Sequence, residues 1–558
     1  MPGCKSYFLM RRETTVASQT DEDLPLHLQY PPVEFLDWCE ADKLVSMCSP
    51  PHEVITWNTL TSTYRDASVA QQFVNRSSAL GCQPLPQWQS TTNLLRGDFE
   101  QMLRCKFVIP LQARPEEVLF PIKLFSVIEE RSSGLRRRLI GWPLSTNDFE
   151  RAIYEEAVAP LSVPFATAAS ARTAAVRKYA AQADFKKYFQ QFELVAKSAF
   201  CFVHRHQVFT LASVPTGAVG PPVFAEILTR AVTAFAIRKC NAGTVVHADT
   251  MIDNVRFSSD DYDALVSVWQ AFIDCCKTVG ITIGDSMSPT LVMQPYTFMG
   301  ISFDHANHTV SLTEKTKRKL VAARDFVFSA RNQNVLVSDI ASAFGITLTA
   351  AQTLNTALHD HYFVFKFIKR IAKYAAAAPN YDVAMHKIWN SVIEPWSDWI
   401  SAMLASPEAV VRHLDTAAAT SCVAYSDASD SGWGMIIYWP DGSVTSHGQP
   451  WSQLDRSLHI NRKELKAAMF VIERVSQEAT RRGIPELRIA LNIDNTTAIA
   501  WLTRGHADAR EVNTMLGRIA SLPHVAVQSI TYCRSEDNPA DAPSRYHHKG
   551  QGNDVSCP

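Results

Sequence analysis

Hydrophobic and polar positions follow different patterns in successive parts of the chain. Between residues 93 and 110, apolar residues that include Phe99 and Met102 recur at helical spacing, and the strand-like segment KFVIP closes this stretch. Helical and strand patterns then alternate to about residue 310, which predicts a mixed α/β region. Residues 311–415 carry helical patterns, alanine-rich segments and scarcely a strand signal. We therefore expect a helical connecting region there.

A different pattern begins near residue 421. The segment SCVAYSDASDSGWGMIIYWPDGSVTSHG alternates apolar and polar residues around an Asp-Gly pair, which predicts an antiparallel hairpin at the start of a C-terminal α/β domain. The beginning of the chain carries no pattern that we can interpret. Together the patterns predict an α/β (α+β) multidomain protein. Its predicted parts are an N-terminal region of unknown role (1–95), a mixed α/β region (96–310), a helical connecting region (311–415), a C-terminal α/β domain (416–546) and a tail (547–558).

Length and composition limit the class of protein. With 558 residues, 46% hydrophobic and 20% charged, the chain has the composition of a globular protein with more than one core. No apolar run approaches the roughly 20 residues of a membrane span, and the N-terminal MPGCKSYFLMRRETT lacks the apolar core of a signal peptide. We expect a soluble protein of the cytoplasm or nucleus. The twelve cysteines include no CxxC pair, which favours free thiols over a zinc site.

Cationic residues gather locally although the net charge is only −1. The segments are SSGLRRRLIGW (132–142), TEKTKRKL (313–320) and KFIKRIAK (366–373). Each alone is consistent with a solvated surface. All three together favour contacts with the phosphates of a nucleic acid.

Two aspartates interrupt the apolar, strand-like run VVHADTMIDNVRF. Asp249 and Asp253 stand where a buried strand would carry hydrophobic side chains. A buried carboxylate costs several kcal/mol unless it is paired, hydrogen-bonded or bound to a metal. The run is therefore a candidate for chemistry.

Four acids of the C-terminal region occupy positions that can converge. Asp427 and Asp494 end predicted strands, Glu464 lies in a predicted helix, and Asp541 lies in NPADAPSR. Carboxylates crowded at one edge of a sheet remain ionised together only if they hold divalent cations. Two Mg²⁺ ions are a standard device for cutting a phosphodiester.

The segments SDASDSGWG, HINRKEL, NIDN and EDNPADAPSR resemble the ribonuclease H domain of retroelement reverse transcriptases. The resemblance makes Asp427, Glu464, Asp494 and Asp541 metal ligands for Mg²⁺, or Mn²⁺, with two ions in the site. Many members carry a histidine in the loop before the last aspartate. Here that loop reads CRSEDN, which puts the speed of cleavage in question more than cleavage itself.

The central region resembles the polymerase part of the same family. AQADFKKYFQQFEL is similar to the first catalytic motif, which makes Asp184 a ligand for both metals of a second two-ion site. In the family the following aromatic lies under the sugar, so Phe189 would be the steric gate that selects deoxynucleotides. The resemblance also implies a fold with right-hand palm and fingers, a helical thumb or connection, and a ribonuclease H-like mixed sheet.

Further segments resemble the parts that hold the nucleotide. FPIKLFSVIEERSSGLRRRLIGWPLSTN is similar to the fingers hairpin, where a lysine and an arginine grip the triphosphate. Lys123 and either Arg137 or Arg138 are the candidates. SVPTGAVGPPVFAEIL is similar to the family's Leu-Pro-x-Gly loop, which assigns nucleotide contacts to Thr216 and Gly217. FMGISFD resembles the primer grip hairpin.

Order and spacing align VVHADTMIDNVRF with the family's Y-x-D-D hairpin. Asp253 in MIDN matches the catalytic aspartate better, and Asp249 in HADT is the alternative. Met251 stands where the family has tyrosine, and Asn254 where it has the second aspartate. The first of the paired aspartates is the ligand in the family, so Asp184 and Asp253 would supply both carboxylates.

The resemblance implies an enzyme: an RNA-directed DNA polymerase, copying RNA and DNA, with ribonuclease H activity. Its partners would be an RNA template, a DNA primer, the RNA/DNA hybrid and deoxynucleoside triphosphates. The segments HINRKEL and NPADAPSR are most similar to those of the DIRS, Ngaro and VIPER retrotransposons, which use a separately encoded tyrosine recombinase. Two alternatives stay open: a ribonuclease H with a decayed polymerase, and a domesticated nucleic-acid-binding scaffold.

Overall fold

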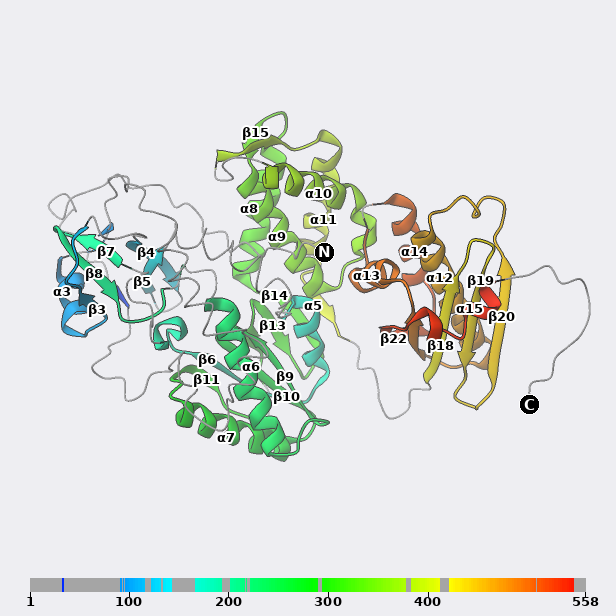
Figure 1. Ribbon diagram of the computed structural model, residues 1–558, viewed down its shortest axis with the longest axis horizontal. Coiled ribbons are helices and arrows are strands. Elements are labelled where there is room, and N and C mark those ends of the chain that lie inside the picture. The colour runs from blue at the N-terminus through cyan, green and yellow to red at the C-terminus, as the bar shows by residue number, and fades with distance from the viewer. Residues whose placement is uncertain are drawn as a thin grey trace, which may run out of the picture. The chain divides into compact units, whose positions relative to one another are not determined.

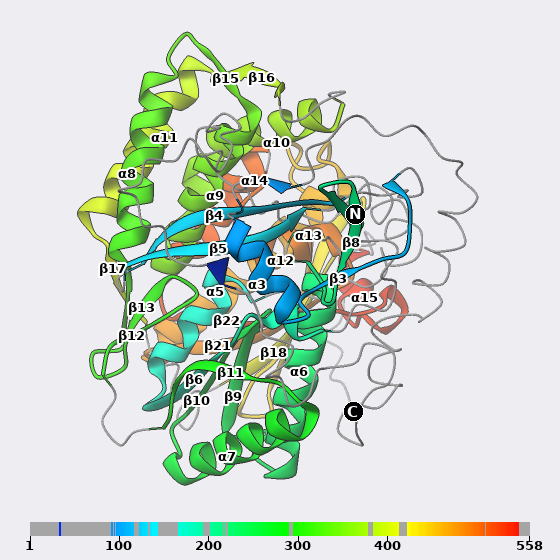
Figure 2. The same cartoon turned by 90° about the vertical axis from the view of Figure 1, so that its left-hand side faces the viewer.

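The structure is a computed structural model in which the chain forms two compact units, residues 1–309 and 310–558 (Figures 1 and 2). It describes residues 33–34, 91–92, 94, 96–115, 122–131, 134–142, 166–192, 201–215, 217, 221–289, 294–377, 383–411, 421–507 and 509–545. Most of the uninterpreted N-terminal region, Thr216 and the predicted tail therefore lie outside the described residues.

The first unit is built around an antiparallel sheet with the strand order β11-β6-β10-β9. Its strands are β6 (Tyr179–Phe185), β9 (Val246–Met251), β10 (Asn254–Ser259) and β11 (Ile283–Met287). Helices α6 (Pro221–Lys239) and α7 (Tyr262–Val279) bury their apolar residues against the sheet in one core. Asp261 caps the N-terminus of α7 and Gly280, with φ +83°, ends it in the left-handed conformation that suits glycine.

Smaller elements complete this unit. A long hairpin, β4 with β5, belongs to a second sheet, and β3, β8 and β7 form a third. A short hairpin joins β12 to β13. The bounds are β1 Val33–Glu34, β2 Thr91–Thr92, α3 Arg96–Arg104, β3 Val108–Pro110, β4 Lys123–Arg131, β5 Gly134–Trp142, α5 Ala168–Ala171, η2 Arg172–Val176, η3 Tyr188–Gln191, β7 Cys201–His204, β8 Gln207–Leu211, β12 Tyr296–Phe298 and β13 Ile301–Asp304.

The second unit begins with helices that share one core around Trp396. The helices are amphipathic, and their buried side chains include the fully buried Trp396, whose indole N–H donates to Thr347. The bounds are β14 Thr309–Leu312, α8 Glu314–Ser329, β15 Asn334–Leu336, α9 Val337–Leu354, η5 Leu358–His361, α10 Tyr362–Ala377, β16 Met385–Lys387, α11 Asn390–Ala405 and β17 Glu408–Val410.

A five-stranded mixed sheet, in the order β20-β19-β18-β21-β22, forms the rest of this unit. The first three strands are antiparallel neighbours, and β21 and β22 run parallel to β18. The bounds are β18 Ser421–Ala428, β19 Gly432–Tyr438, β20 Val444–Pro450, α12 Ile460–Arg482, β21 Leu487–Ile493, α13 Thr496–Arg504, α14 Arg510–Ala520, β22 Val525–Tyr532, η7 Ser535–Asp537 and α15 Asp541–Ser544. Helix α12 packs on this sheet through the core that holds Leu465, Val471 and Ile472.

The predicted mixed α/β multidomain fold is confirmed. Phe99 and Met102 are buried on α3, and the segment after residue 420 forms antiparallel strands that turn at Asp441 and Gly442. In its described residues, the segment 311–415 forms four long helices, α8 to α11, accompanied by the short strands β15, β16 and β17 and the end of β14. None of the helices in the described residues is long and apolar enough to cross a membrane.

Candidate active sites

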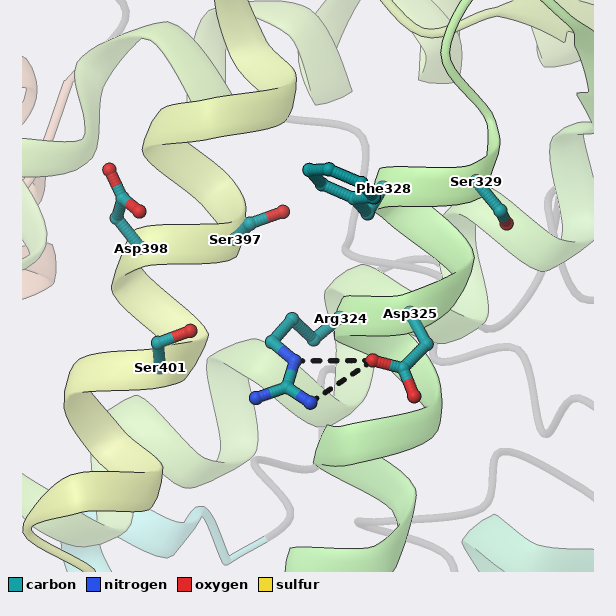
Figure 3. A pocket seen from close by; sticks show the side chains of 7 residues that line it. All are labelled: Arg324, Asp325, Phe328, Ser329, Ser397, Asp398 and Ser401. Carbon is teal, nitrogen blue, oxygen red and sulfur yellow. Dashed lines mark hydrogen bonds and ion pairs between the residues drawn. The ribbon is translucent and has the colours of Figure 1, made fainter.

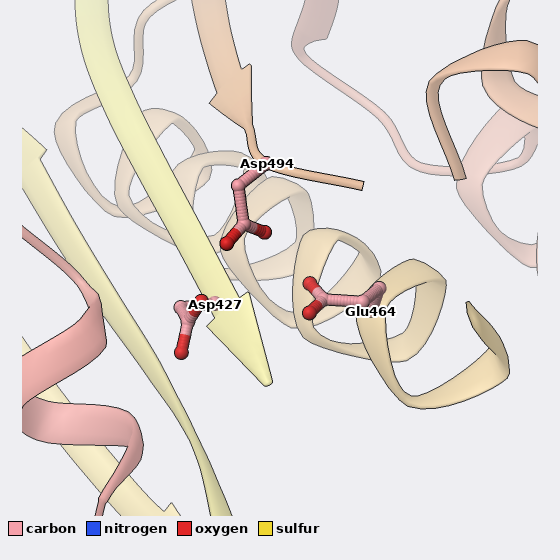
Figure 4. Close-up of side chains that lie close together, drawn as sticks. All are labelled: Asp427, Glu464 and Asp494. Atoms are coloured by element: carbon pink, nitrogen blue, oxygen red, sulfur yellow. The ribbon is translucent and has the colours of Figure 1, made fainter. Parts of the chain in front are cut away.

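Three acids meet at one edge of the C-terminal sheet (Figure 4). Asp427 lies near the end of β18, Asp494 directly follows the parallel strand β21, and Glu464 projects from α12. Since parallel neighbours end at the same edge of a sheet, the two aspartates are brought together by the topology. Oxygen atoms of the three carboxylates lie within 4.8 Å of one another. A single cation can therefore contact all three.

Asp541 lines the same hollow from a different element. It is the first residue of α15, and its Oδ1 accepts two hydrogen bonds from the Arg545 guanidinium, at 3.0 and 2.8 Å. The hollow is lined by Asp427, Glu464, Asp494, Asp541, Ser535, Arg545 and the 428–431 turn. All four predicted acids thus face one hollow, although Asp541 stands outside the tight group of three.

Close backbone contacts hold the segment that carries Asp541. A Cβ atom on Gly434 would collide with the backbone of Ala540, and one on Gly448 would collide with that of Pro543. Glycine at these two positions of β19 and β20 is what lets the segment lie against the strands. Asn538 adds a side-chain hydrogen bond of 3.0 Å to the carbonyl of Ser426.

The electrostatics of the hollow oppose ionisation of the acids in the absence of cations. Burial, together with the charges of Asp494 and Asp427, raises the pKa of Glu464 to about 9. Burial also raises the pKa of Asp427 to about 6, with Asp494 and Asp541 adding to the effect. Among the residues that the structure describes, two buried oxygens, Oε2 of Glu464 and Oδ1 of Asp494, have no hydrogen-bond partner. Unpaired, hard carboxylate oxygens of this kind fit a divalent cation such as Mg²⁺.

A second pair of acids lies in the first unit, on neighbouring strands. Asp184 is the penultimate residue of β6, and Asp253 lies in the two-residue turn between β9 and β10. Asn254, which follows Asp253, is paired in register with Asp184, and the amide of Phe185 donates a 2.9 Å hydrogen bond to the carbonyl of Asp253. The fold therefore brings the two predicted carboxylates to one end of the sheet.

The surroundings of Asp253 combine burial with neighbouring donors. Burial raises the pKa of the Asp253 carboxyl, whereas the Arg138 cation and the Asn254 side chain lower it. Nδ2 of Asn254 donates a 2.9 Å hydrogen bond to Oδ1 of Asp253. Arg138 is thereby close enough to influence the turn electrostatically.

Asp249, the alternative catalytic aspartate, has a structural partner. Its Oδ2 lies 2.7 Å from the Arg256 guanidinium, and Arg256 is fully buried. The guanidinium also lies 4.5 and 4.3 Å from the ring centroids of Phe298 and Phe303, on the short hairpin β12–β13. Asp249 thus neutralises a buried cation on the adjacent strand, and Asp253 is the acid at the turn.

The structure separates the two arginine candidates. Arg137 is buried on β5, where its guanidinium lies 2.8 Å from the buried Asp98 and 3.3 Å from the Ser126 hydroxyl. Arg138, the next residue, is exposed on the opposite face of the strand. Burial and the Asp98 ion pair hold Arg137 inside the protein, and Arg138 is the exposed one of the two candidates. Lys123 begins β4, with its ammonium 5.9 Å from the Phe125 ring centroid.

The other predicted nucleotide contacts follow β6 and the 213–217 loop. Phe189 lies in the short helix η3 after β6, partly buried against the core. The amide of Gly217 donates a 3.2 Å hydrogen bond to the carbonyl of Gly141, and a Cβ on Gly217 would lie 2.6 Å from that oxygen. The loop therefore lies directly against the end of β5. Thr216 is outside the described residues.

Two of the cationic segments lie on helices with exposed faces. On α8, Lys317 pairs with Glu314 at 2.7 Å, whereas on α10 the ammonium of Lys366 and the guanidinium of Arg370 lie over the rings of Tyr362 and Trp389. Both helices keep other cations on the solvent side. Nucleic-acid binding by these faces stays a prediction.

A larger hollow, of about 500 Å³, lies between α8 and α11 (Figure 3). Its lining consists of Arg324, Asp325, Phe328, Ser329, Ser397, Asp398 and Ser401. Arg324 is hydrogen-bonded to the neighbouring Asp325 (Figure 3). The arrangement is that of a groove between helices rather than a catalytic group.

Sequence reasoning missed a buried acid beside the polymerase candidates. Glu226 is fully buried on α6 and accepts a hydrogen bond from the amide of Ile252, in the turn that carries Asp253. A signal was present, since Glu226 is the one acid in the helical run PPVFAEILTRAVTAFAI.

No family model matches the chain, and no curated protein matches it in sequence. Solved structures that are similar to this chain include three of the foamy viral protease-reverse transcriptase. One, the dRH form with double-stranded DNA, is 13% identical with a TM-score of 0.40, covering 86% of this chain and 81% of that one. Another with double-stranded DNA is 11% identical with a TM-score of 0.39, covering 86% and 97%. The third, with an RNA/DNA hybrid, is 12% identical with a TM-score of 0.38, covering 90% and 65%.

Proposed function

We propose that the chain is a reverse transcriptase with two separate active sites, one that makes DNA and one that cleaves the RNA strand of an RNA/DNA hybrid. The observation that carries the proposal is the hollow of four carboxylates, in which Glu464 and Asp494 each hold a buried oxygen without a partner in the described part of the chain. Such a cluster destabilises its domain unless it binds cations. This argues for a working site over a non-enzymatic scaffold.

In the cleavage site, Asp427, Glu464 and Asp494 would hold divalent cations, with Asp541 completing the set. When bound, the cations stabilise the negative charge that develops on a phosphodiester during hydrolysis. Ser535 donates a 2.7 Å hydrogen bond to Oδ2 of Asp494 and so fixes the orientation of that carboxylate. Arg545 lines the hollow and offers a cation toward a phosphate.

In the synthesis site, Asp184 and Asp253 would hold the cations that activate the primer end and bind the triphosphate. Lys123 and Arg138 would contact the triphosphate, Phe189 the sugar, and Thr216 and Gly217 the incoming base pair. Asn254 offers a neutral group where a third carboxylate would add negative charge. We therefore expect synthesis to need more Mg²⁺ than a site with three acids.

Paired variants test the two-site proposal. Asp427→Asn is expected to abolish cleavage of an RNA/DNA hybrid and leave primer extension on poly(rA)·oligo(dT) nearly unchanged, and Asp253→Asn is expected to do the reverse. Concurrent loss of both activities in either variant would contradict separate sites. A wild-type protein that cleaves RNA but extends no primer, with Mg²⁺ or Mn²⁺, would instead support the alternative of a decayed polymerase.

The finer assignment to a DIRS-, Ngaro- or VIPER-like retrotransposon rests on HINRKEL and NPADAPSR, and it implies a recombinase encoded separately. Sequencing the DNA that flanks the coding region tests it. A neighbouring tyrosine-recombinase reading frame is the expected result.

A further inference from the structure

The turn that carries Asp253 has an unfavourable backbone conformation. Ile252, the other residue of this turn, has φ +59°, in the left-handed region that β-branched residues rarely adopt. Its side chain is buried. A residue in this region is energetically unfavourable and persists only where its surroundings hold it. Some neighbouring group must therefore stabilise the turn.

Helix α6 supplies those groups. Oε2 of Glu226 accepts a 2.6 Å hydrogen bond from the amide of Ile252, and Oε1 accepts one of 2.7 Å from the hydroxyl of Thr250. One helical turn later, the hydroxyl of Thr229 lies 2.5 Å from the carbonyl oxygen of Ile252. Both backbone groups of the strained residue are thus bonded to side chains of the same helix.

Glu226 is itself held in place. Arg230, four residues later on α6, donates from Nε to Oε1 at 2.6 Å. The carboxylate is fully buried and carries three donors in all, so its charge is compensated and its position is fixed. A rigid acceptor of this kind suits the positioning of a backbone amide more than catalysis.

We propose that Glu226 is a positioning residue that holds the Ile252 turn so that Asp253 can bind a divalent cation, with Thr229 acting from the other side of the turn. The inference rests on the proposed function and deepens it. Glutamine at position 226 keeps one acceptor oxygen but puts an NH₂ group where the second oxygen accepts. Either Ile252 or the pair Arg230 and Thr250 then loses its acceptor.

Metal binding tests the inference without relying on turnover. In a full-length background with Asp427→Asn and Asp494→Asn, which disables the other proposed cation site, Mn²⁺ is titrated and followed by electron paramagnetic resonance. Glu226→Gln is expected to weaken Mn²⁺ binding roughly tenfold, the size typical of losing a group that orients a metal ligand. Thr229→Val should weaken it in the same direction, and it covers the case in which the Glu226 variant does not fold.

Thr233→Val is the matched control. Thr233 is buried on the same helix, but its hydroxyl donates to the carbonyl of Thr229 and not to the turn. Equal Mn²⁺ affinities in the Glu226, Thr229 and Thr233 variants would overturn the inference, as would the absence of Mn²⁺ binding in the background protein. Weaker Mn²⁺ binding by the Glu226 variant, alongside a wild type that extends no primer, would uphold the inference and refute the proposed DNA synthesis.

Discussion

The side-chain amide of Asn254 donates a hydrogen bond of 2.9 Å to Oδ1 of Asp253. This bond occupies part of the carboxylate that we assign to metal binding, and it comes from the residue that departs from the family pattern. Replacing Asn254 by aspartate removes the donor and adds a negative charge beside the metal position. We expect Asn254→Asp to lower the Mg²⁺ concentration needed for half-maximal primer extension, because a third carboxylate at the site attracts the cation.

Asn254→Ala separates the two effects of that substitution. It removes the hydrogen bond without adding charge, so its Mg²⁺ requirement should lie between those of the wild type and Asn254→Asp. A higher requirement in Asn254→Asp than in the wild type would show that the amide serves the site better than a charge does.

Asp249 and Asp253 should respond oppositely to removal of the carboxylate. Asp249→Ala leaves the buried Arg256 without its ion-pair partner, which typically costs about 3–5 kcal/mol of stability. Asp253→Asn should change stability little and eliminate primer extension. Chemical unfolding measures the first effect and single-turnover extension by the folded fraction measures the second. If folded Asp249→Ala is inactive and Asp253→Asn is active, HADT is the catalytic turn.

Arg137 and Arg138 provide a second contrast between neighbours. Arg137→Met should destabilise the protein because it removes the ion pair between Arg137 and the buried Asp98 carboxylate. Arg138→Met should leave the melting temperature near that of the wild type and raise the KM for deoxynucleoside triphosphates about tenfold, the loss expected for a charge-assisted contact. An unchanged KM in the Arg138 variant would remove it from the triphosphate site.

The sequence predicted the mixed α/β elements, and the convergence of the acids, where a local pattern carried the information. Asp427, Glu464 and Asp494 could be predicted to converge because strand ends and a nearby helix meet at one sheet edge. The choice between Arg137 and Arg138 could not be predicted. Alternation along the strand places the two arginines on opposite faces but does not say which face is buried. That depends on Asp98, a partner that is distant in the sequence.

Partners distant in sequence explain the other gaps as well. The role of Asp249 depends on the rings of Phe298 and Phe303 around Arg256, and that of Glu226 depends on the backbone conformation of Ile252. Neither relationship produces a hydrophobic periodicity or a sequence motif by which it could be recognised. They follow from packing, which periodicity does not specify.

Phe189 lies after β6 and is only partly buried, so its ring can contact a bound nucleotide. Phe189→Ala is expected to admit ribonucleotides by opening space beside the sugar. The measurement is the ratio of kcat/KM for a deoxynucleotide to that for the matching ribonucleotide. An unchanged ratio in the Phe189 variant would mean that another residue selects the sugar.

The acids of the cleavage site should make the metal-free domain less stable at neutral pH. The pKa of Asp427 is about 6 in the folded protein against 3.8 for the free side chain, so its ionisation opposes folding. The penalty is fully present above pH 6 and is relieved as the pH falls from about 6 to 4. In EDTA at pH 7.5, Asp427→Asn should therefore raise the stability of this domain by about 1–3 kcal/mol. The gain should disappear near pH 4, where wild-type Asp427 is also neutral.

Saturating Mg²⁺ should reverse the order of stability of the two proteins, because only the wild type keeps the full set of metal ligands. Hydrogen exchange of peptides within residues 421–545 measures this stability locally, and equal protection of both proteins in EDTA at pH 7.5 would show that the carboxylates are not crowded enough to require a cation.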